Sequence, residues 1–200
     1  MTNRSISVKL AMAGVLFATV ASCSSEVPGL PSATPSSPGA ASPTQKAPSV
    51  RQPLNADKFL TAPCTSLDQA QLDKLNSQGT GKPAILNGDP NCSWEFGPNG
   101  DTGAGLTYVS SVKNGLSNLY ALDETGWWKN GYFEPTAVNE YPAAYNELVD
   151  NRVKGDCVLS VAITDALFFT VSVRARAGND VCTAAKNVAS DVIDTIKKGA

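Results

Sequence analysis

The stretch Val20-Ala21-Ser22-Cys23 constrains folding most strongly, because it ends an apolar segment and precedes one that is rich in proline and serine. Before it, residues 1–9 carry Arg4 and Lys9 without an acidic residue, and residues 10–20 form a nearly unbroken apolar run. A basic start, a short apolar run and small residues are typical of a secretory signal peptide. As a helix, the apolar run would rise about 16 Å, which is about half of a hydrocarbon core of about 30 Å. We therefore expect no permanent transmembrane span here and a domain that folds after export.

The same four residues resemble a bacterial lipobox, in which a branched aliphatic residue and two small residues precede a cysteine. The resemblance implies cleavage before Cys23 and a lipid (diacylglyceryl, with palmitate-type chains) on its sulfur. One acyl chain holds a protein at a membrane only marginally, whereas two or three hold it stably. We interpret residues 1–22 as a lipoprotein signal peptide and expect the mature chain to be anchored at the outer face of the cytoplasmic membrane. The alternative is an ordinary signal peptide with Cys23 as a spare thiol.

Residues 23–53 are interpreted as the lipidated cysteine followed by a tether. Residues 24–53 contain seven prolines and seven serines and show no hydrophobic periodicity. Such a segment cannot bury enough apolar surface to offset its ordering entropy, so we expect it to be disordered. A single folded domain is expected over residues 54–200.

The charge balance is mildly acidic. Lys and Arg total 16 and Asp and Glu total 18, and losing Arg4 and Lys9 with a signal peptide would leave a net charge of −4. Without a basic stripe, nucleic acid is not expected as a partner.

Local patterns over residues 54–200 predict a mixed domain. Helices are expected near residues 66–75, where Ser66 and Gln69 form a capping-box pattern, after a cap at Asn114, and from a cap at Asp180 onward. Residues 79–90 are interpreted as turns. Strands are expected over residues 92–96, 106–112, 143–149, 157–164 and 168–176. The predicted fold class is α+β, with an antiparallel β-sheet of about five strands and helices packed on one face.

The last two strands predict a hairpin register. Ile163 and Phe169 lie on the apolar faces of their strands, and same-face partners must lie opposite each other. Pairing these two residues places Thr164 opposite Phe168 and leaves a three-residue loop at residues 165–167.

Four cysteines remain after Cys23, an even number in a chain expected to leave the reducing cytoplasm, and this predicts two disulfides. Of the three possible pairings we favour Cys64–Cys92 and Cys157–Cys182, because each joins the start of a helix to a strand of one sheet. Loop entropy differs only slightly among the pairings. The requirement for Cα atoms within about 7 Å therefore decides between them.

Several short motifs occur in a distinctive order: Pro63-Cys64, Cys92-x-Trp94, Tyr141-Pro142-Ala143-Ala144, a strand at Cys157, and Cys182-x-x-Ala185. This order resembles the DUF3558 family of actinobacterial lipoproteins over roughly residues 54–196, plus the lipobox. The resemblance implies an exported, membrane-anchored α+β domain with two disulfides and no established activity, so no functional residues carry over from it. One departure is Glu140, because a glycine often precedes the Tyr-Pro-Ala step, and this leaves the conformation of that loop open.

The residue types that several kinds of catalysis require are missing. The chain has no histidine, which removes Ser-His-Asp and Cys-His catalysis and imidazole metal ligation. It has no Cys-x-x-Cys pair, Gly-rich phosphate loop or EF-hand loop, so we expect neither a metal nor a cofactor. The pairs Asp123 with Glu124 and Glu134 with Glu140 could serve glycoside hydrolysis only at a suitable separation across a cleft, which the sequence does not show.

Aromatic residues between positions 127 and 145 form the main candidate binding surface. We single out Trp127, Trp128, Tyr132 and Tyr141 as candidate ligand-binding residues, with core packing as the alternative. Adjacent Trp127 and Trp128 cannot both point inward from an extended segment, so one of them should be exposed. An exposed Trp on an anchored domain would suit contact with a lipid, a glycan or an envelope protein.

Three functions remain open from the sequence. The first is a non-catalytic binding or accessory module in the cell envelope, which we favour. The others are a carboxylate-dependent envelope enzyme and a purely structural envelope protein. A closed apolar pocket lined by Trp127 or Trp128 would favour the first function. Two convergent, desolvated carboxyl groups in a cleft would favour the second, and a featureless surface with one flat apolar patch would favour the third.

Overall fold

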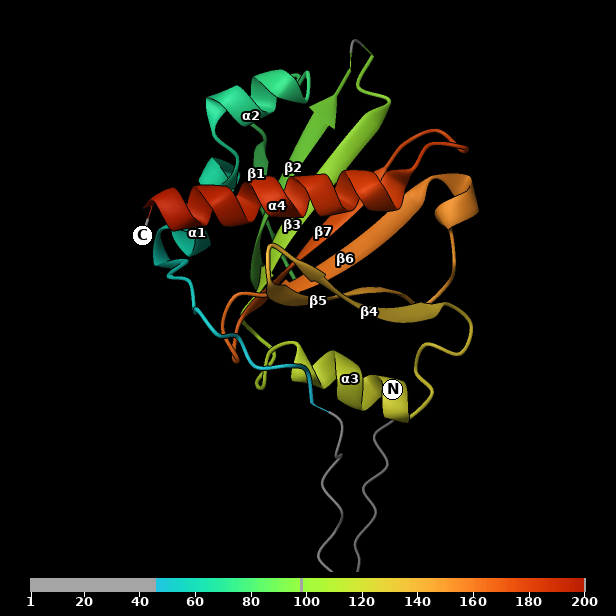
Figure 1. Cartoon of the computed structure of the whole chain (residues 1–200). Coiled ribbons are helices and arrows are strands. Elements are labelled where there is room, and N and C mark those ends of the chain that lie inside the picture. The colour runs from blue at the N-terminus through green and yellow to red at the C-terminus, as the bar shows by residue number, and fades with distance from the viewer. Residues whose placement is uncertain (1–45, 98, 200) are drawn as a thin grey trace, which may run out of the picture. The chain divides into compact units, whose positions relative to one another are not determined.

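The computed structural model describes residues 46–97 and 99–199, whose arrangement is shown in Figure 1. Within them, seven strands form one antiparallel sheet in the order β1-β2-β3-β7-β6-β5-β4. The strands are β1 (Lys82–Leu86), β2 (Asp89–Phe96), β3 (Thr102–Val109), β4 (Tyr132–Val138), β5 (Tyr141–Glu147), β6 (Asp156–Ala162) and β7 (Phe168–Arg174). The helices are α1 (Asp57–Thr61), α2 (Gln69–Lys74), α3 (Ser117–Glu124) and α4 (Val181–Gly199), with 3-10 turns η1 (Pro63–Ser66) and η2 (Arg152–Lys154).

The α+β class and the antiparallel sheet are confirmed, whereas the expected number of about five strands is corrected to seven. The two additional strands, β1 and β4, are the two edges of the sheet. The proposed signal peptide, Cys23 and residues 24–45 of the proposed tether lie outside the described residues.

Helix α4 lies across the sheet and packs mainly over β6 and β7 (Figure 1). Its cap at Asp180 is confirmed, because the Thr183 backbone N–H donates to Asp180 Oδ1 at 3.0 Å. The residues at helical spacing on its inner face are all buried: Val181, Ala185, Val188, Val192 and Ile196. This stripe packs against the sheet and forms a large part of the hydrophobic core. Burial of each aliphatic side chain in it contributes about 1.5–3 kcal/mol to the free energy of unfolding.

Helix α3 packs on the opposite side of β4. Tyr132 on β4 faces α4, since its hydroxyl lies 3.8 Å from Sγ of Cys157, which is bonded to Cys182 at the start of α4. Phe133, the next residue, must face the other way. Its ring packs edge-on against Tyr120 of α3, with ring centroids 5.0 Å apart. The expectation that all helices share one face therefore holds for α4 and not for α3.

The first predicted helix is shorter than expected and begins later. Its capping box is formed by Asp68 and Gln71: the Gln71 N–H donates to Asp68 Oδ1 at 2.9 Å, and the Asp68 N–H donates to Gln71 Oε1 at 2.7 Å. Ser66, the expected cap, is buried, and its hydroxyl is 2.8 Å from the hydroxyl of Tyr108. Asn114 does not cap α3 either, because the helix begins at Ser117 and Asn114 has φ 70°.

The register of the β6–β7 hairpin differs from the expected one by two residues. Phe169 pairs with Val161 rather than with Ile163, so the apolar faces still coincide. The turn begins earlier because Thr164 Oγ1 accepts hydrogen bonds from the N–H groups of Ala166 and Leu167, at 3.1 and 2.9 Å. Thr164 therefore belongs to the turn and does not pair with Phe168, whose partner is Ala162.

The segment of residues 46–52, called the strap below, packs against the domain ahead of the expected boundary at Leu54. Val50 is buried, and its N–H donates to Asp165 Oδ1 at 2.8 Å. The Ala47 N–H donates to Ser117 Oγ at 3.2 Å, and the Tyr141 hydroxyl donates to the Gln52 carbonyl at 3.0 Å. The strap thus connects α3, the β6–β7 turn and β5.

Candidate functional site

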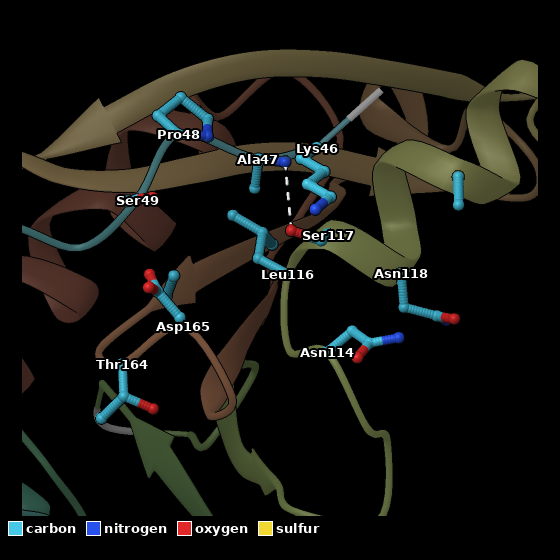
Figure 2. Close-up of a pocket in the computed structure, with 12 residues that line it drawn as sticks. Lys46, Ala47, Pro48, Ser49, Asn114, Leu116, Ser117, Asn118, Thr164 and Asp165 are labelled. Atoms are coloured by element: carbon cyan, nitrogen blue, oxygen red, sulfur yellow. Dashed lines mark hydrogen bonds between the residues drawn. The ribbon is translucent and has the colours of Figure 1, made fainter. Parts of the chain in front are cut away.

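A cavity of about 630 Å³, called the strap pocket below, lies between the strap, the start of α3 and the β6–β7 turn (Figure 2). Its apolar lining comes from Leu116, Ala121 and Ala162, and its polar lining includes Asn114, Asn118, Thr164 and Asp165. Cavities of about 300–1,000 Å³ with an apolar base and a few polar groups are the usual form of small-molecule sites.

The walls of the strap pocket are held close together by backbone contacts. Gly115 has φ 51°, and a Cβ there would lie 2.7 Å from the carbonyl oxygen of Asp165. Only glycine permits this approach without displacing the turn. Because the strap donates two N–H groups to side chains of the other two walls, the three segments form one unit.

The polar lining of the strap pocket is mostly neutral. Asp165 is the one carboxylate among its described lining residues, and it already accepts the Val50 N–H. Amide and hydroxyl groups predominate among the remaining polar groups, with the Lys46 ammonium group at one side. Among the residues that the structure describes, no cluster of three or more acidic or cysteine ligands could hold a metal ion.

The structure separates the candidate aromatic residues of the sequence. Trp127 is 54% exposed, whereas Trp128 is buried and stacks on Phe133 with ring centroids 5.9 Å apart. One of the two tryptophans is thus exposed, as expected, although they lie in a turn and not in a strand. Tyr141 is buried at the strap, with Nζ of Lys197 5.1 Å from its ring centre. None of the four is among the residues that line the strap pocket.

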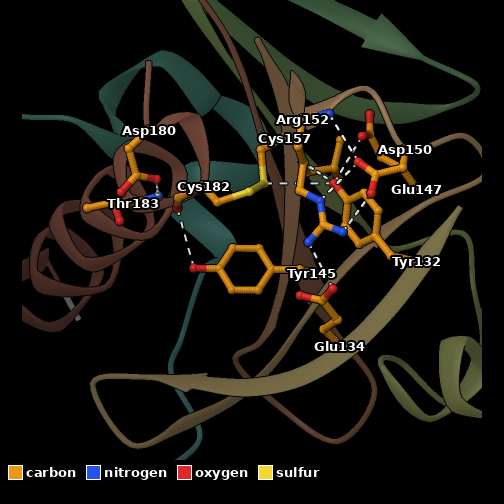
Figure 3. Close-up of a disulfide and its surroundings, with 11 residues drawn as sticks. Tyr132, Glu134, Tyr145, Glu147, Asp150, Arg152, Cys157, Asp180, Cys182 and Thr183 are labelled. Carbon is orange, nitrogen blue, oxygen red and sulfur yellow. Dashed lines mark hydrogen bonds and ion pairs between the residues drawn. A yellow bond between two sulfur atoms is a disulfide. The ribbon is translucent and has the colours of Figure 1, made fainter. Parts of the chain in front are cut away.

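Tyr132 belongs to a charged cluster beside the Cys157–Cys182 disulfide (Figure 3). Its hydroxyl donates to Glu147 Oε2 at 2.9 Å, and the guanidinium of Arg152 lies 4.0 Å from its ring centre. Arg152 in turn binds Asp150 at 2.7 Å and Glu134 at 2.8 Å. Burial raises the pKa of Tyr132. Burial also raises the pKa of Glu147, with a further contribution from nearby Asp156 and Asp150.

The structure places the carboxylates of this cluster in an ion-pair network around Arg152. Glu134 is engaged with Arg152, and its predicted partner Glu140 lies in the turn between β4 and β5. The network fixes the loop after β5 against β4, since Arg152 joins Asp150 of the loop to Glu134 of the strand. Charge-assisted, forked hydrogen bonds of this kind hold geometry well.

Both predicted disulfides are confirmed. Cys64 and Cys92 have Cα atoms 5.0 Å apart, and Cys157 and Cys182 have Cα atoms 5.3 Å apart. The first bond joins η1 to β2, and the second joins β6 to the first turn of α4.

Sequence reasoning did not identify the lining of the strap pocket. Asn114, Ser117 and Asp165 are polar residues of a loop, a helix start and a turn, which are common at such positions. The one local signal was Asn114-Gly115, two consecutive residues with positive φ that allow a tight approach of the backbone.

No helix within the described residues has both the length and the apolar character that a membrane crossing requires.

No curated protein and no solved structure matches the chain. One family model matches residues 18–195, and its description is "Protein of unknown function (DUF3558)". This match spans most of the 200 residues and includes both disulfides and the full sheet. The chain therefore belongs to the DUF3558 family.

Proposed function

We propose that the protein is a lipid-anchored, non-catalytic binding module of the cell envelope, with its ligand in the strap pocket. The observation that carries this proposal is the pocket itself, about 630 Å³, whose lining combines apolar side chains with mostly neutral polar groups. Its polar groups suit a small polar molecule that offers hydrogen-bond donors and acceptors.

The location in this proposal is the outer face of the cytoplasmic membrane, through an acylated Cys23. The signal-like residues 1–22 and the lipobox-like step to Cys23 support it. The two disulfides add support, because such bonds persist outside the reducing cytoplasm. In this arrangement the strap is the part of the domain nearest in sequence to the anchor, so the pocket lies where the tether joins the domain.

The pocket lining favours binding over the alternative of a carboxylate-dependent enzyme. A glycoside hydrolase needs two carboxyl groups about 5–10 Å apart across a cleft. The described lining residues supply Asp165 alone, and that carboxylate is occupied by the strap.

Native mass spectrometry of the protein, extracted from the membranes of its own cells, tests the proposal. We expect a mass that includes acyl chains on Cys23 and a population that retains a small molecule. Ala121→Trp should fill the pocket from α3 and abolish the retained molecule while the acyl mass remains. Ala137→Trp, on the edge strand β4, is the matched control and should retain it.

The two parts of the proposal fail separately. If the wild-type protein carries no retained molecule, or if Ala121→Trp retains it as well as the control does, the strap pocket is not the binding site. If a Cys23→Ala protein remains on the membrane after a high-salt wash, the lipid anchor is wrong.

A further inference from the structure

Two loops at one end of the sheet carry most of the exposed large apolar side chains of the described residues. They are the α3–β4 loop (residues 125–131) and the β5–β6 loop (residues 148–155), called the end loops below; both lie at the right of Figure 1. Their backbones are in contact, because a Cβ on Gly131 would lie 1.9 Å from the carbonyl oxygen of Glu147 and 2.7 Å from the carbonyl carbon of Leu148. The two loops therefore begin side by side, next to the paired ends of β4 and β5.

The exposed apolar residues of the end loops are Trp127 at 54%, Leu148 at 51%, Val149 at 55% and Val153 at 81%. In the part of the chain that the structure describes, only two other large apolar side chains are exposed, Ile85 and Leu86 on β1. Single exposed apolar residues are normal on a protein surface, whereas a contiguous group marks an interaction site.

The end loops also carry two exposed lysines, Lys129 and Lys154, and neither forms a salt bridge within the described residues. The third cation, Arg152, is paired with Asp150 and Glu134. Arg152 is held in place by Asp150 and by the ring of Tyr132, so the neighbouring Val153 and Lys154 are presented outward by a fixed turn. A tryptophan, aliphatic side chains and lysines together are the composition of segments that lie at a membrane interface.

The position of the strap, through which the chain enters the described domain, also favours a membrane surface as the partner. The strap is bonded to Ser117, the first residue of α3, through the Ala47 N–H. Trp127 follows the end of α3 by three residues, and α3 has eight residues, which corresponds to about 12 Å. A lipid anchor on Cys23 would therefore hold the end loops within the reach of the tether from the bilayer. A high effective concentration of this kind allows a weak contact to be occupied.

We propose that the end loops dock on the lipid surface of the membrane, with Trp127, Leu148, Val149 and Val153 at the level of the headgroups. Lys129 and Lys154 contact anionic headgroups in this arrangement. The geometry rests on the lipid anchor of the proposed function, but the contact itself can be measured without it. Because the contact is weak and partly electrostatic, a high-salt wash removes it, which keeps it distinct from the anchor.

Vesicle binding of the mature chain with Cys23→Ala tests the proposal without the acyl group. The vesicles are phosphatidylcholine, with and without phosphatidylglycerol, and carry a bromine-labelled lipid that quenches tryptophan fluorescence. Trp94 and Trp128 are 2% and 9% exposed, so quenching reports on Trp127. We expect quenching that is stronger on the anionic vesicles and is reversed by salt.

Substitutions locate the contact. Val153→Ser should lower partitioning by about threefold or more, and Lys129→Gln with Lys154→Gln should lower it on anionic vesicles alone. Ile85→Ser, which removes a comparably exposed apolar side chain from β1, is the matched control and should leave partitioning unchanged.

Three results would overturn the proposal. One is the absence of Trp127 quenching on both kinds of vesicle. If the acylated protein nevertheless stays with membranes, the docking proposal fails and the lipid anchor stands. Another is an equal loss of partitioning in Ile85→Ser. The third is a dimer in sedimentation experiments that Val153→Ser abolishes, because the end loops would then be an interface between copies of this chain.

Discussion

The turn between β4 and β5 shows how a single residue can carry backbone strain. Asn139 and Glu140 both have positive φ, 46° and 70°. This region costs a residue with a Cβ roughly 1–2 kcal/mol, and asparagine tolerates it best. Asn139 has compensation, since its side-chain amide donates to Ser190 Oγ at 2.9 Å and to Asp194 Oδ1 at 3.4 Å. Within the described residues, the structure gives no such hydrogen bond to the Glu140 side chain. In the family that the sequence resembles, a glycine often occupies this position.

We expect Glu140→Gly to stabilise the protein by about 0.5–1 kcal/mol, because relief of the left-handed strain exceeds the extra entropy of glycine in the unfolded chain. Urea unfolding followed by circular dichroism measures the change. Asn139→Gly is the matched control and should give no gain, since it also loses the side-chain hydrogen bonds to Ser190 and Asp194 of α4. A lower midpoint for Glu140→Gly would mean that the glutamate side chain itself stabilises the turn.

Each of the two edge strands carries a proline that opposes pairing with another chain. Two-residue turns close both outer hairpins, at residues 87–88 and 139–140, so the closing pairs Leu86 with Asp89 and Val138 with Tyr141 are the hydrogen-bonded ones. Alternation then makes Pro83 and Pro135 the residues whose nitrogen points away from the sheet. A proline at such a position removes a free donor from the edge and opposes pairing with another chain.

We expect Pro83→Thr and Pro135→Thr each to increase self-association at high protein concentration, because each restores an N–H on an open edge. Sedimentation velocity over a concentration series measures this. Ala84→Thr and Ala137→Thr add the same side chain on the same strands without a new donor, so they should sediment like the wild type. Equal association of the proline and alanine variants would show that the side chain, and not the N–H group, is responsible.

Elements with strong local signals could be predicted from the sequence, and the edge strands could not. Helix α4 combines a cap at Asp180 with a long apolar stripe, and β6 and β7 alternate over a full strand length. Strand β1 is exposed at every position, so it has no alternation to detect. Its one signal was Asn87-Gly88, a pair typical of a two-residue hairpin turn. Pro135 obscured β4, although proline is compatible with an edge.

The strap pocket depends on contacts that no local pattern contains. Ala47 reaches Ser117 across 70 positions, and Val50 reaches Asp165 across 115. At the scale of the whole molecule, these contacts place the start of the folded part before residue 50, although the composition of residues 24–53 looks uniform. The composition of the strap does not set it apart from the expected tether, but a single buried valine and three hydrogen bonds to its backbone attach it to the domain.

Limited proteolysis distinguishes this boundary from the one that the composition predicts. Because a protease must bind several residues in extended form, cleavage should stop where the strap is bonded, and we expect a resistant fragment that begins near residue 46. Asp165→Ala removes the acceptor of the Val50 N–H, so its fragment should begin closer to Leu54, whose own N–H still donates to the Ile163 carbonyl at 2.9 Å. Asp156→Ala removes a carboxylate that is paired with Arg174 and not with the strap, so its resistant fragment should begin at the same residue as that of the wild type. Mass spectrometry of the fragments gives the first residue in each case. A wild-type fragment that begins at Leu54 would show that the strap does not stay bound in solution, and the strap pocket would then lose one of its three walls.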